Sequence, residues 1–293
     1  PQQANQLARY TSAYWGTQPL TAPYYAGVVV VLLFAIGVAF ADKKYVWWLV
    51  AASILGIMLS WGNNFEGFNN LMFDHFPGYN KFRSVIFAML FPILCMNLLG
   101  FIGLETLARK GLTKDTQKKF IIAIGTVAGI AFFFFATGGF GSFKSPIDEQ
   151  LPVWLVSAMK QDRIGLLRAD AGRALIFILA TSALLYMVLK EKIAQPIAWS
   201  LLALLILIDM WSVDARVFSK DNFGRSPRKE FFAANGADQQ IKKDKGHYRV
   251  FNLLNPWNDA RTSYHHHSLG GYHGAKMRRY QDLIELHLSP EMQ

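Results

Sequence analysis

The sequence predicts an α-helical integral membrane protein with about six transmembrane helices, followed by a small, truncated α+β extracytoplasmic domain. Of its 293 residues, 52% are hydrophobic and 17% are charged, whereas soluble domains usually carry about 25% charged residues. The long apolar runs lie within residues 25–213, and residues 214–293 have the mixed composition of a soluble protein. We therefore expect an outer loop over residues 1–24, a transmembrane domain over 25–213 and a soluble tail over 214–293.

Six apolar runs approach the length of about 20 residues that a transmembrane helix needs. They are residues 25–41, 45–61, 85–108, 120–137, 171–189 and 196–213. The first two are short and depend on flanking aromatic residues as anchors at the membrane surface. Core helices of a large soluble protein are the alternative, but the charged connectors between the runs fit a bilayer better.

The connectors differ in their density of basic residues. Those after the first, third and fifth runs are dense, with Lys43, Lys44, Arg109, Lys110, Lys114, Lys118, Lys119, Lys190 and Lys192. Those after the second and fourth runs are longer and more dilute. Because cytoplasmic loops gather Lys and Arg, we expect residues 62–84, 138–170 and 214–293 to be extracytoplasmic.

Local patterns divide these outer segments further. Residues 62–84 predict an interfacial helix and a turn at Pro77-Gly78, and residues 151–167 form a second amphipathic stretch. In the tail, the alternation over residues 247–254 predicts a short strand and residues 275–288 a closing helix.

The net charge of +10 and the single Cys95 bear on two questions, whether the protein binds nucleic acid and whether it contains disulfide bonds. Basic loops are usual in membrane proteins and no nucleic-acid motif is present, so we expect no nucleic-acid partner. One cysteine cannot form an internal disulfide. The sequence also lacks a Gly-rich phosphate loop, a nucleophile elbow and an HExxH motif, which argues against ATPase, serine hydrolase and zinc protease chemistry.

Three ionisable residues fall within or at the ends of the apolar runs. Asp209 and Glu105 are functional hypotheses because charge at membrane depth is costly, but both lie near run ends, where water can solvate them. Arg173, at the start of the fifth run, is expected to extend toward the surface.

The outer loop 62–84 contains the first group of candidate binding residues. Lys81 and Arg83 stand beside aromatic residues that include Tyr79, a combination that suits a lipid phosphate or, equally, unspecific binding to anionic lipid. Glu66, Asp74 and His75 could act as acid or base near a sugar, although their spacing is not specific.

The tail contains the second group. Tyr264, the run His265-His266-His267 and His273 could bind a polar substrate, form a structural turn with Gly270-Gly271, or bind zinc. Consecutive histidines diverge and no carboxylate or cysteine completes a zinc site, so we predict no metal and no cofactor; a divalent metal has no support in this chain.

Several motifs, in order and spacing, resemble the YfhO family of bacterial membrane proteins. They are Trp61-Gly62-Asn63-Asn64-Phe65, Phe76-Pro77-Gly78-Tyr79-Asn80-Lys81-Phe82-Arg83, Thr262-Ser263-Tyr264-His265, Gly270-Gly271-Tyr272-His273-Gly274-Ala275-Lys276 and Arg278-Arg279-Tyr280-Gln281. Proteins of that family are much longer, so the resemblance implies that this chain is a middle portion.

The resemblance implies a GT-C-like glycosyltransferase in the bacterial cytoplasmic (inner) membrane. Such an enzyme transfers a sugar from a polyprenyl-phosphate donor to a cell-envelope polymer, so membrane lipid, the lipid-linked sugar and the polymer acceptor are the implied partners. GT-C enzymes usually carry an acidic motif in their first outer loop, which this chain lacks, so the catalytic base cannot be named.

Two other functions remain open. A transporter or flippase for lipid or polymer precursors would explain the ionisable residues in the membrane, although no internal repeat is visible. A non-enzymatic envelope assembly protein would use the tail as its docking surface.

Overall fold

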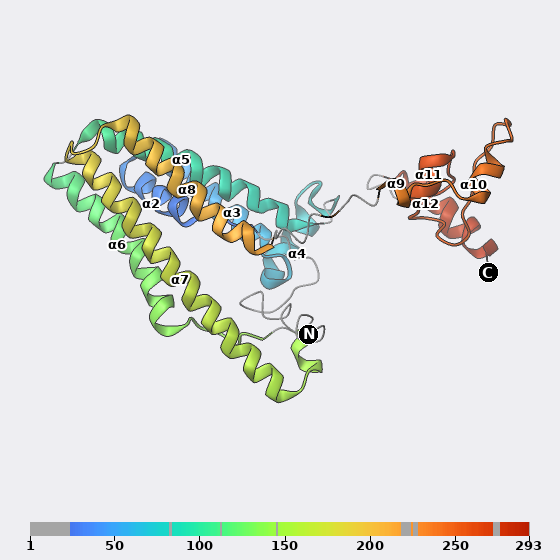
Figure 1. Cartoon of the computed structure of the whole chain (residues 1–293), viewed down its shortest axis with the longest axis horizontal. Helices are drawn as coiled ribbons and strands as arrows, with labels where there is room; N and C mark the ends of the chain where they lie inside the picture. Colours follow the sequence, from blue (N-terminus) through green and yellow to red (C-terminus); the bar gives the residue numbers. More distant parts are fainter. Residues whose placement is uncertain are drawn as a thin grey trace. The chain divides into compact units, whose positions relative to one another are not determined.

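A computed structural model describes residues 24–81, 84–111, 113–144, 146–217, 224, 228–271 and 276–292. The chain divides into two compact units, Pro1–Phe218, here called the membrane unit, and Ser219–Gln293, the tail unit. Helices build the described parts of both units (Figure 1).

The membrane unit consists of long helices joined by short helical turns. Its α-helices are α2 (Val28–Phe40), α3 (Lys43–Ser60), α4 (Glu66–His75), α5 (Leu90–Lys110), α6 (Lys114–Thr137), α7 (Val153–Leu189) and α8 (Gln195–Val217). Its 3-10 turns are Gly62–Phe65, Tyr79–Lys81, Val85–Met89 and Pro146–Gln150. The short helix α4 and the turn at Gly78, where φ is 82°, confirm the predicted order of elements in the loop 62–84.

Four helical segments of the described residues are long and apolar enough to cross a membrane: Val85–Lys110, Lys114–Thr137, Val153–Leu189 and Gln195–Arg216. Their surfaces are apolar as well, since large hydrophobic side chains such as Phe91, Ile121 and Leu207 are exposed. Apolar surface on this scale does not face water in a monomeric soluble protein. The chain is therefore a helical membrane protein.

The predicted run 25–41 becomes the short helix α2, which lies in the middle of the membrane unit. Its 13 residues span about 20 Å, less than the hydrocarbon core of about 30 Å. It packs against α5, α6, α7 and α8, and Val29, Leu32 and Ile36 are completely buried. A helix that is apolar on all sides is stable when other helices surround it, which explains this central position.

Glycines allow α2 and α5 to pack closely. A Cβ atom on Gly37 would lie 2.3 Å from the carbonyl oxygen of Leu99, and one on Gly103 would lie 2.3 Å from Cα of Gly37. Small residues serve this purpose in membrane helices because the close approach increases van der Waals contact. The pair Gly37 and Gly103 therefore sets the distance between the two helices.

The basic connectors meet at one end of the membrane unit. In Figure 1, the α5–α6 and α7–α8 connections lie together at one end of the membrane unit, and the opposite ends of these helices lie away from it. Phe40, before the α2–α3 connection, belongs to the same buried cluster as Leu107, Phe120 and Val188. Trp47 and Trp48 are exposed in the first turns of α3 near this end, as interfacial anchors are.

The predicted amphipathic stretch 151–167 and the predicted span 171–189 are one continuous helix. The 37 residues of α7 extend about 55 Å, about 25 Å more than the hydrocarbon core. Its first half carries Lys160, Asp162, Arg163 and Arg168, whereas Ile178–Leu189 is apolar. The N-terminal part of α7 therefore projects beyond the bilayer.

The tail unit is helical, and the predicted α+β character is wrong for its described residues. It contains α9 (Arg228–Phe231), α10 (Gly236–Ile241), α11 (Ala260–His265), α12 (Arg278–Leu283), a π-turn (Ile284–Leu288) and a 3-10 turn (Pro290–Met292). The predicted strand over 247–254 forms a single bridge, Val250 with Ser268. The chain turns at Leu253, so the pairing ends after this bridge.

We predict that Gly37→Ala and Gly103→Ala each destabilise the membrane unit by about 1–3 kcal/mol, the usual effect of overpacking. Gly125→Ala and Gly129→Ala in α6 are matched controls, because nothing lies within 4 Å of their added Cβ atoms. In a helix interior these controls should be neutral or stabilise by up to about 1 kcal/mol. Thermal unfolding in detergent measures all four, and equal effects of the two sets would contradict the packing described.

Candidate functional site

The loop between α6 and α7 folds back on the projecting part of α7. A Cβ on Gly138 would touch Ile164 and Arg168, and one on Gly139 would touch Leu167. Both glycines have positive φ, 76° and 81°, a conformation that other residues adopt only with strain. The sequence Gly138-Gly139 thus turns the chain sharply enough to lay the loop on the helix.

A buried ion pair fixes this loop. Arg163 of α7 is completely buried, and Asp148 of the turn Pro146–Gln150 is 2% exposed. The guanidinium donates two hydrogen bonds to the carboxylate, Nη1 to Oδ2 at 2.5 Å and Nη2 to Oδ1 at 3.1 Å. Nη1 also donates to the carbonyl oxygen of Phe143 at 2.6 Å. Such a bidentate pair fixes the position of the loop on α7 as well as stabilising it.

Phe143 is strained in this loop. Its φ is 53°, in the left-handed region that non-glycine residues avoid, and its side chain is buried. Strained backbone persists where the surroundings over-determine it, and such positions cluster at functional sites. Here the buried side chain and the Arg163 hydrogen bond hold it.

A cavity of about 360 Å³ opens beside the ion pair, lined by residues of the loop and of the projecting α7. Its polar lining consists of Lys144, Lys160, Ser157 and Glu149, next to Asp148. Leu151, Val153 and Val156 supply an apolar wall. The cavity therefore offers two ammonium groups, a hydroxyl and a carboxylate at the end of a membrane helix, a set that suits an anionic, hydroxyl-bearing ligand.

The candidates in the loop 62–84 lie on α4 and the turn after it. Glu66, Asp74, His75 and Lys81 are exposed, and His75 Nδ1 lies 3.2 Å from the carbonyl oxygen of Leu71 in its own helix. They remain predictions, and Arg83 lies outside the described residues.

Tyr79 has a structural role in this loop. Its hydroxyl donates to Oδ1 of the buried Asn69 at 2.5 Å, and Nδ2 of Asn69 donates toward the carbonyl oxygens of Met58 and Phe65. Burial raises the pKa of the Tyr79 phenol, so the hydroxyl remains a donor. This contact joins the turn Tyr79–Lys81 to α4 and the end of α3.

Asp209 lies in a second polar cluster, inside the bundle. Its side chain is completely buried and accepts hydrogen bonds from Tyr25 Oη at 2.7 Å, the Val29 backbone N–H at 3.2 Å and Arg173 Nη1 at 2.8 Å. Arg173 also donates to Tyr25 Oη at 2.8 Å and Ser212 Oγ at 2.9 Å. Arg173 therefore points at Asp209 rather than toward the surface, and the expectation that water solvates Asp209 is wrong.

A further ion pair continues this cluster toward the surface. Arg216 donates to both carboxylate oxygens of Asp170, with Nη1 2.9 Å from Oδ2, and Asp170 lies 3.8 Å from Arg173 Nε. Alternating charges thus join α7 to α8. Glu105, in contrast, is exposed and pairs with Arg109 one turn later, as expected for a solvated residue at a helix end.

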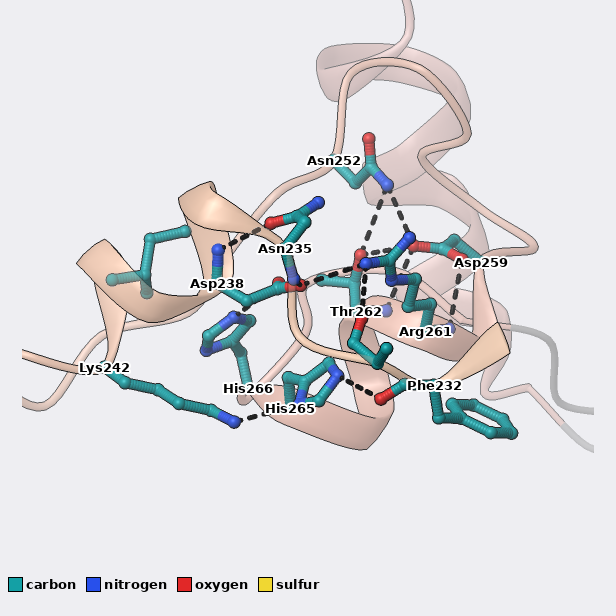
Figure 2. Close-up of polar contacts among 12 residues, drawn as sticks. Phe232, Asn235, Asp238, Lys242, Asn252, Asp259, Arg261, Thr262, His265 and His266 are labelled. Carbon is teal, nitrogen blue, oxygen red and sulfur yellow. Dashed lines mark hydrogen bonds and ion pairs between the residues drawn. The ribbon is translucent and has the colours of Figure 1, made fainter. Parts of the chain in front are cut away.

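Two linked networks organise the tail unit (Figure 2). In the first, Asp259 accepts hydrogen bonds from the backbone N–H groups of Arg261 and Thr262, both at 3.0 Å, and from Asn252 Nδ2 at 2.8 Å. The Thr262 hydroxyl also donates to Asp259. This hydroxyl, Asn252 and the two N–H groups lower the pKa of Asp259 to about 2. Asp259 is the N-cap of α11.

The second network surrounds Asp238. Its carboxylate lies 3.0 Å from His266 Nε2 and 3.5 Å from Arg261 Nη2, and it accepts from the Asn235 N–H at 2.9 Å. Burial raises the pKa of Asp238, but the hydrogen bonds and nearby cations outweigh it, and the net shift is downward. The network joins α10 to α11.

The predicted tail residues are mostly engaged in structure. His265 Nε2 donates to the Phe232 carbonyl oxygen at 3.0 Å, so Nδ1 is the acceptor for Lys242 Nζ at 2.9 Å. Tyr264 is exposed with its ring 4.4 Å from that of Phe232. These contacts favour the structural turn among the alternatives for the histidine run. His273 lies outside the described residues.

Gly270 and Gly271 serve the close approach expected of them. A Cβ on Gly270 would lie 1.7 Å from the Pro256 carbonyl oxygen, and Gly271 has a φ of 125°. Among the described residues, no three His, Cys, Asp or Glu side chains come together in a way that could hold a metal.

No protein-family model, curated protein or solved structure matches this chain. The resemblance to the YfhO family therefore remains a prediction. Lys144, Glu149 and Lys160 were not predicted as binding residues, although Gly138-Gly139 and the charged start of α7 are sequence signals of a folded loop.

We predict that the Asp259 cap weakens as pH falls from about 4 to about 2. Because the folded pKa lies below the unfolded value of about 3.9, Asp259 stabilises the fold above about pH 4, and this contribution is lost as the pH falls through the folded value. Hydrogen exchange of residues 259–266, corrected for intrinsic rates, should lose protection in that window.

The Asp259→Ala variant should show lower protection at about pH 7, by about 0.5–2 kcal/mol, and no step between about pH 4 and 2. Asp244→Ala is the control, since that exposed carboxylate accepts a local hydrogen bond from the Gly246 N–H and is not part of α11. An identical pH profile for Asp259→Ala and the unmodified chain would show that another group is responsible.

Proposed function

We propose that this chain is part of a GT-C-like membrane glycosyltransferase that transfers a sugar from a polyprenyl-phosphate donor to a cell-envelope acceptor. The observation that carries the proposal is the cavity beside the Arg163–Asp148 pair, where Lys144, Lys160 and Glu149 meet at the projecting end of α7. The family resemblance supplies the reaction, and the cavity supplies a place for its substrate.

The chemistry of a lipid-linked sugar fits this place. Its phosphate lies at the membrane surface, where two lysines can pair with the anion and stabilise the charge that develops as the phosphate leaves. The carboxylate of Glu149 can accept hydrogen bonds from sugar hydroxyl groups. The Ser157 hydroxyl donates to the Val153 carbonyl oxygen at 2.9 Å, and its oxygen can accept a further hydrogen bond from the sugar. Asp148 is paired with Arg163 and so positions the loop.

The proposed orientation of the chain in the membrane is based on its basic connectors. With α2 and α3 counted, six helices cross or enter the bilayer of a bacterial cytoplasmic membrane, and the basic end faces the cytoplasm. The loop 62–84, the cavity loop 138–152 and the tail 214–293 are then extracytoplasmic. Lys81 and Arg83 would belong to the same side and could contact the same substrate.

The transporter hypothesis has one specific observation in its favour, the buried charges of Asp209 and Arg173. These charges are, however, hydrogen-bonded to each other and to Tyr25, Ser212 and the start of α2. Movement of lipid across proteoliposomes by the purified chain, without sugar transfer by the full-length protein, would favour transport instead.

We predict that Lys144→Ala/Lys160→Ala weakens binding of a short-chain polyprenyl phosphate by about tenfold or more for each lysine. This magnitude follows from the roughly 1.5–3 kcal/mol that a hydrogen bond to a charged group contributes. Binding is measured with the chain in nanodiscs, and sugar incorporation into the envelope is measured with the same variant in the full-length protein.

The matched control is Lys114→Ala/Lys118→Ala, which removes the same charge from exposed positions at the basic end. Equal binding by the two double variants would show that the cavity does not hold the phosphate. Loss of binding with unchanged sugar incorporation would contradict the catalytic role.

A further inference from the structure

A turn in the tail unit exposes two leucines, Leu253 and Leu254. Leu254 is 97% exposed and Leu253 is 69% exposed, although the turn that carries them is part of a folded unit. No charged residue occurs between Arg249 and Asp259. The turn therefore presents uncharged, apolar side chains directly to its surroundings.

The contacts beneath the turn hold it in shape. Oδ1 of Asn252 accepts the Leu254 N–H at 3.0 Å, while Nδ2 of the same side chain donates to Asp259 at 2.8 Å and Thr262 Oγ1 at 3.2 Å. Figure 2 shows Asn252 bridging to the start of α11 in this way. On either side of the turn, the rings of Phe251 and Trp257 lie 5.2 Å apart.

Holding two leucine side chains in water is unfavourable in free energy, because their apolar surface cannot be buried in the core. A loose loop could fold such side chains inward, but the Asn252 hydrogen bonds prevent this. A partner that buries the leucine side chains would remove this unfavourable contact with water.

We infer that the Leu253-Leu254 turn inserts into the interfacial region of the bilayer and anchors the tail unit to the membrane surface. This inference is independent of the glycosyltransferase proposal. Covalent connection supports it: only ten residues separate the end of α8 at Val217 from Arg228, and they can span at most about 35 Å. A membrane surface is thus always within reach of the tail unit.

Charge and shape favour lipid over a protein partner. From Arg228 onward the chain has ten Lys and Arg against seven Asp and Glu, which complements anionic headgroups. Two side chains on a turn offer far less than the roughly 800 Å² per partner that a stable protein interface buries. An apolar tip on a basic unit is the form that interfacial insertion requires.

The experiment places a fluorescent probe on the turn. The full chain carries Leu254→Cys in a Cys95→Ala background, is labelled with an environment-sensitive dye and is reconstituted into vesicles that contain anionic lipid. Because Leu254 is 97% exposed, the substitution leaves folding intact. We expect emission shifted to shorter wavelength and quenching by lipids with a spin label in their acyl chains.

Leu286→Cys, at a position 69% exposed in the same unit, is the matched control and should give emission typical of water with little quenching. Adding Asn252→Ala to Leu254→Cys should reduce the quenching, because the turn loses its support.

Three results would overturn the inference. Emission typical of water at Leu254 would show that the turn stays in solvent. A shift without quenching by lipid would show that protein, either the membrane unit or a second copy, covers the leucines. Equal quenching at Leu254 and Leu286 would show unspecific adsorption of the tail unit.

Discussion

The buried carboxylate of Asp209 at the N-terminus of α2 is the interaction on which the membrane unit depends. Hydrocarbon offers no hydrogen bonds, so the backbone N–H groups at a helix start must find partners within the protein. Gly27 precedes α2 and has no side chain to supply one. Asp209 of α8 accepts the Val29 N–H instead, and a negative charge at this end is also favoured by the helix dipole.

The buried charge in turn determines its surroundings. An isolated carboxylate in a low-dielectric interior is very costly, and Arg173 of α7 and the Tyr25 hydroxyl neutralise and solvate it. One interaction therefore joins α2, α7 and α8. With its start fixed, α2 can run through the bundle and meet α5 at Gly37 and Gly103. A second ion pair, Arg163 with Asp148, acts in the same way beyond the bilayer, where it holds the loop that forms the cavity.

The sequence predicted the parts of this structure that follow from composition and local pattern. Apolar runs located the helices, the Pro77-Gly78 pair located the turn after α4, and the basic residues marked the connectors that meet at one end. Gly270-Gly271 correctly indicated a close approach of backbone. Each of these signals lies within a few residues of the feature that it predicts.

The remaining features depend on contacts between distant parts of the chain. Arg173 and Asp209 are separated by 36 residues, and each alone has the pattern of a residue near a membrane surface. The alternation over residues 247–254 resembles a strand, but a strand needs a partner, and the turn at Leu253 prevents one. Lys144 and Lys160 line the same cavity because the hydrogen bonds of Arg163 hold the loop against α7. Pairing of this kind leaves no periodic signal.

The most direct measurement of the central claim is a double-mutant cycle on Asp209 and Arg173, with unfolding followed in lipid bicelles. We predict that Arg173→Gln costs about 3–5 kcal/mol, because it leaves the buried Asp209 carboxylate without its partner. Asp209→Asn should cost less, because the Arg173 side chain is 19% exposed and keeps Asp170 nearby. The double variant should cost clearly less than the sum of the two. The same cycle on the exposed pair Glu105 and Arg109 should give below about 1 kcal/mol throughout. Single-variant costs at Asp209 and Arg173 no larger than those of the exposed pair would show that the membrane unit does not depend on this interaction.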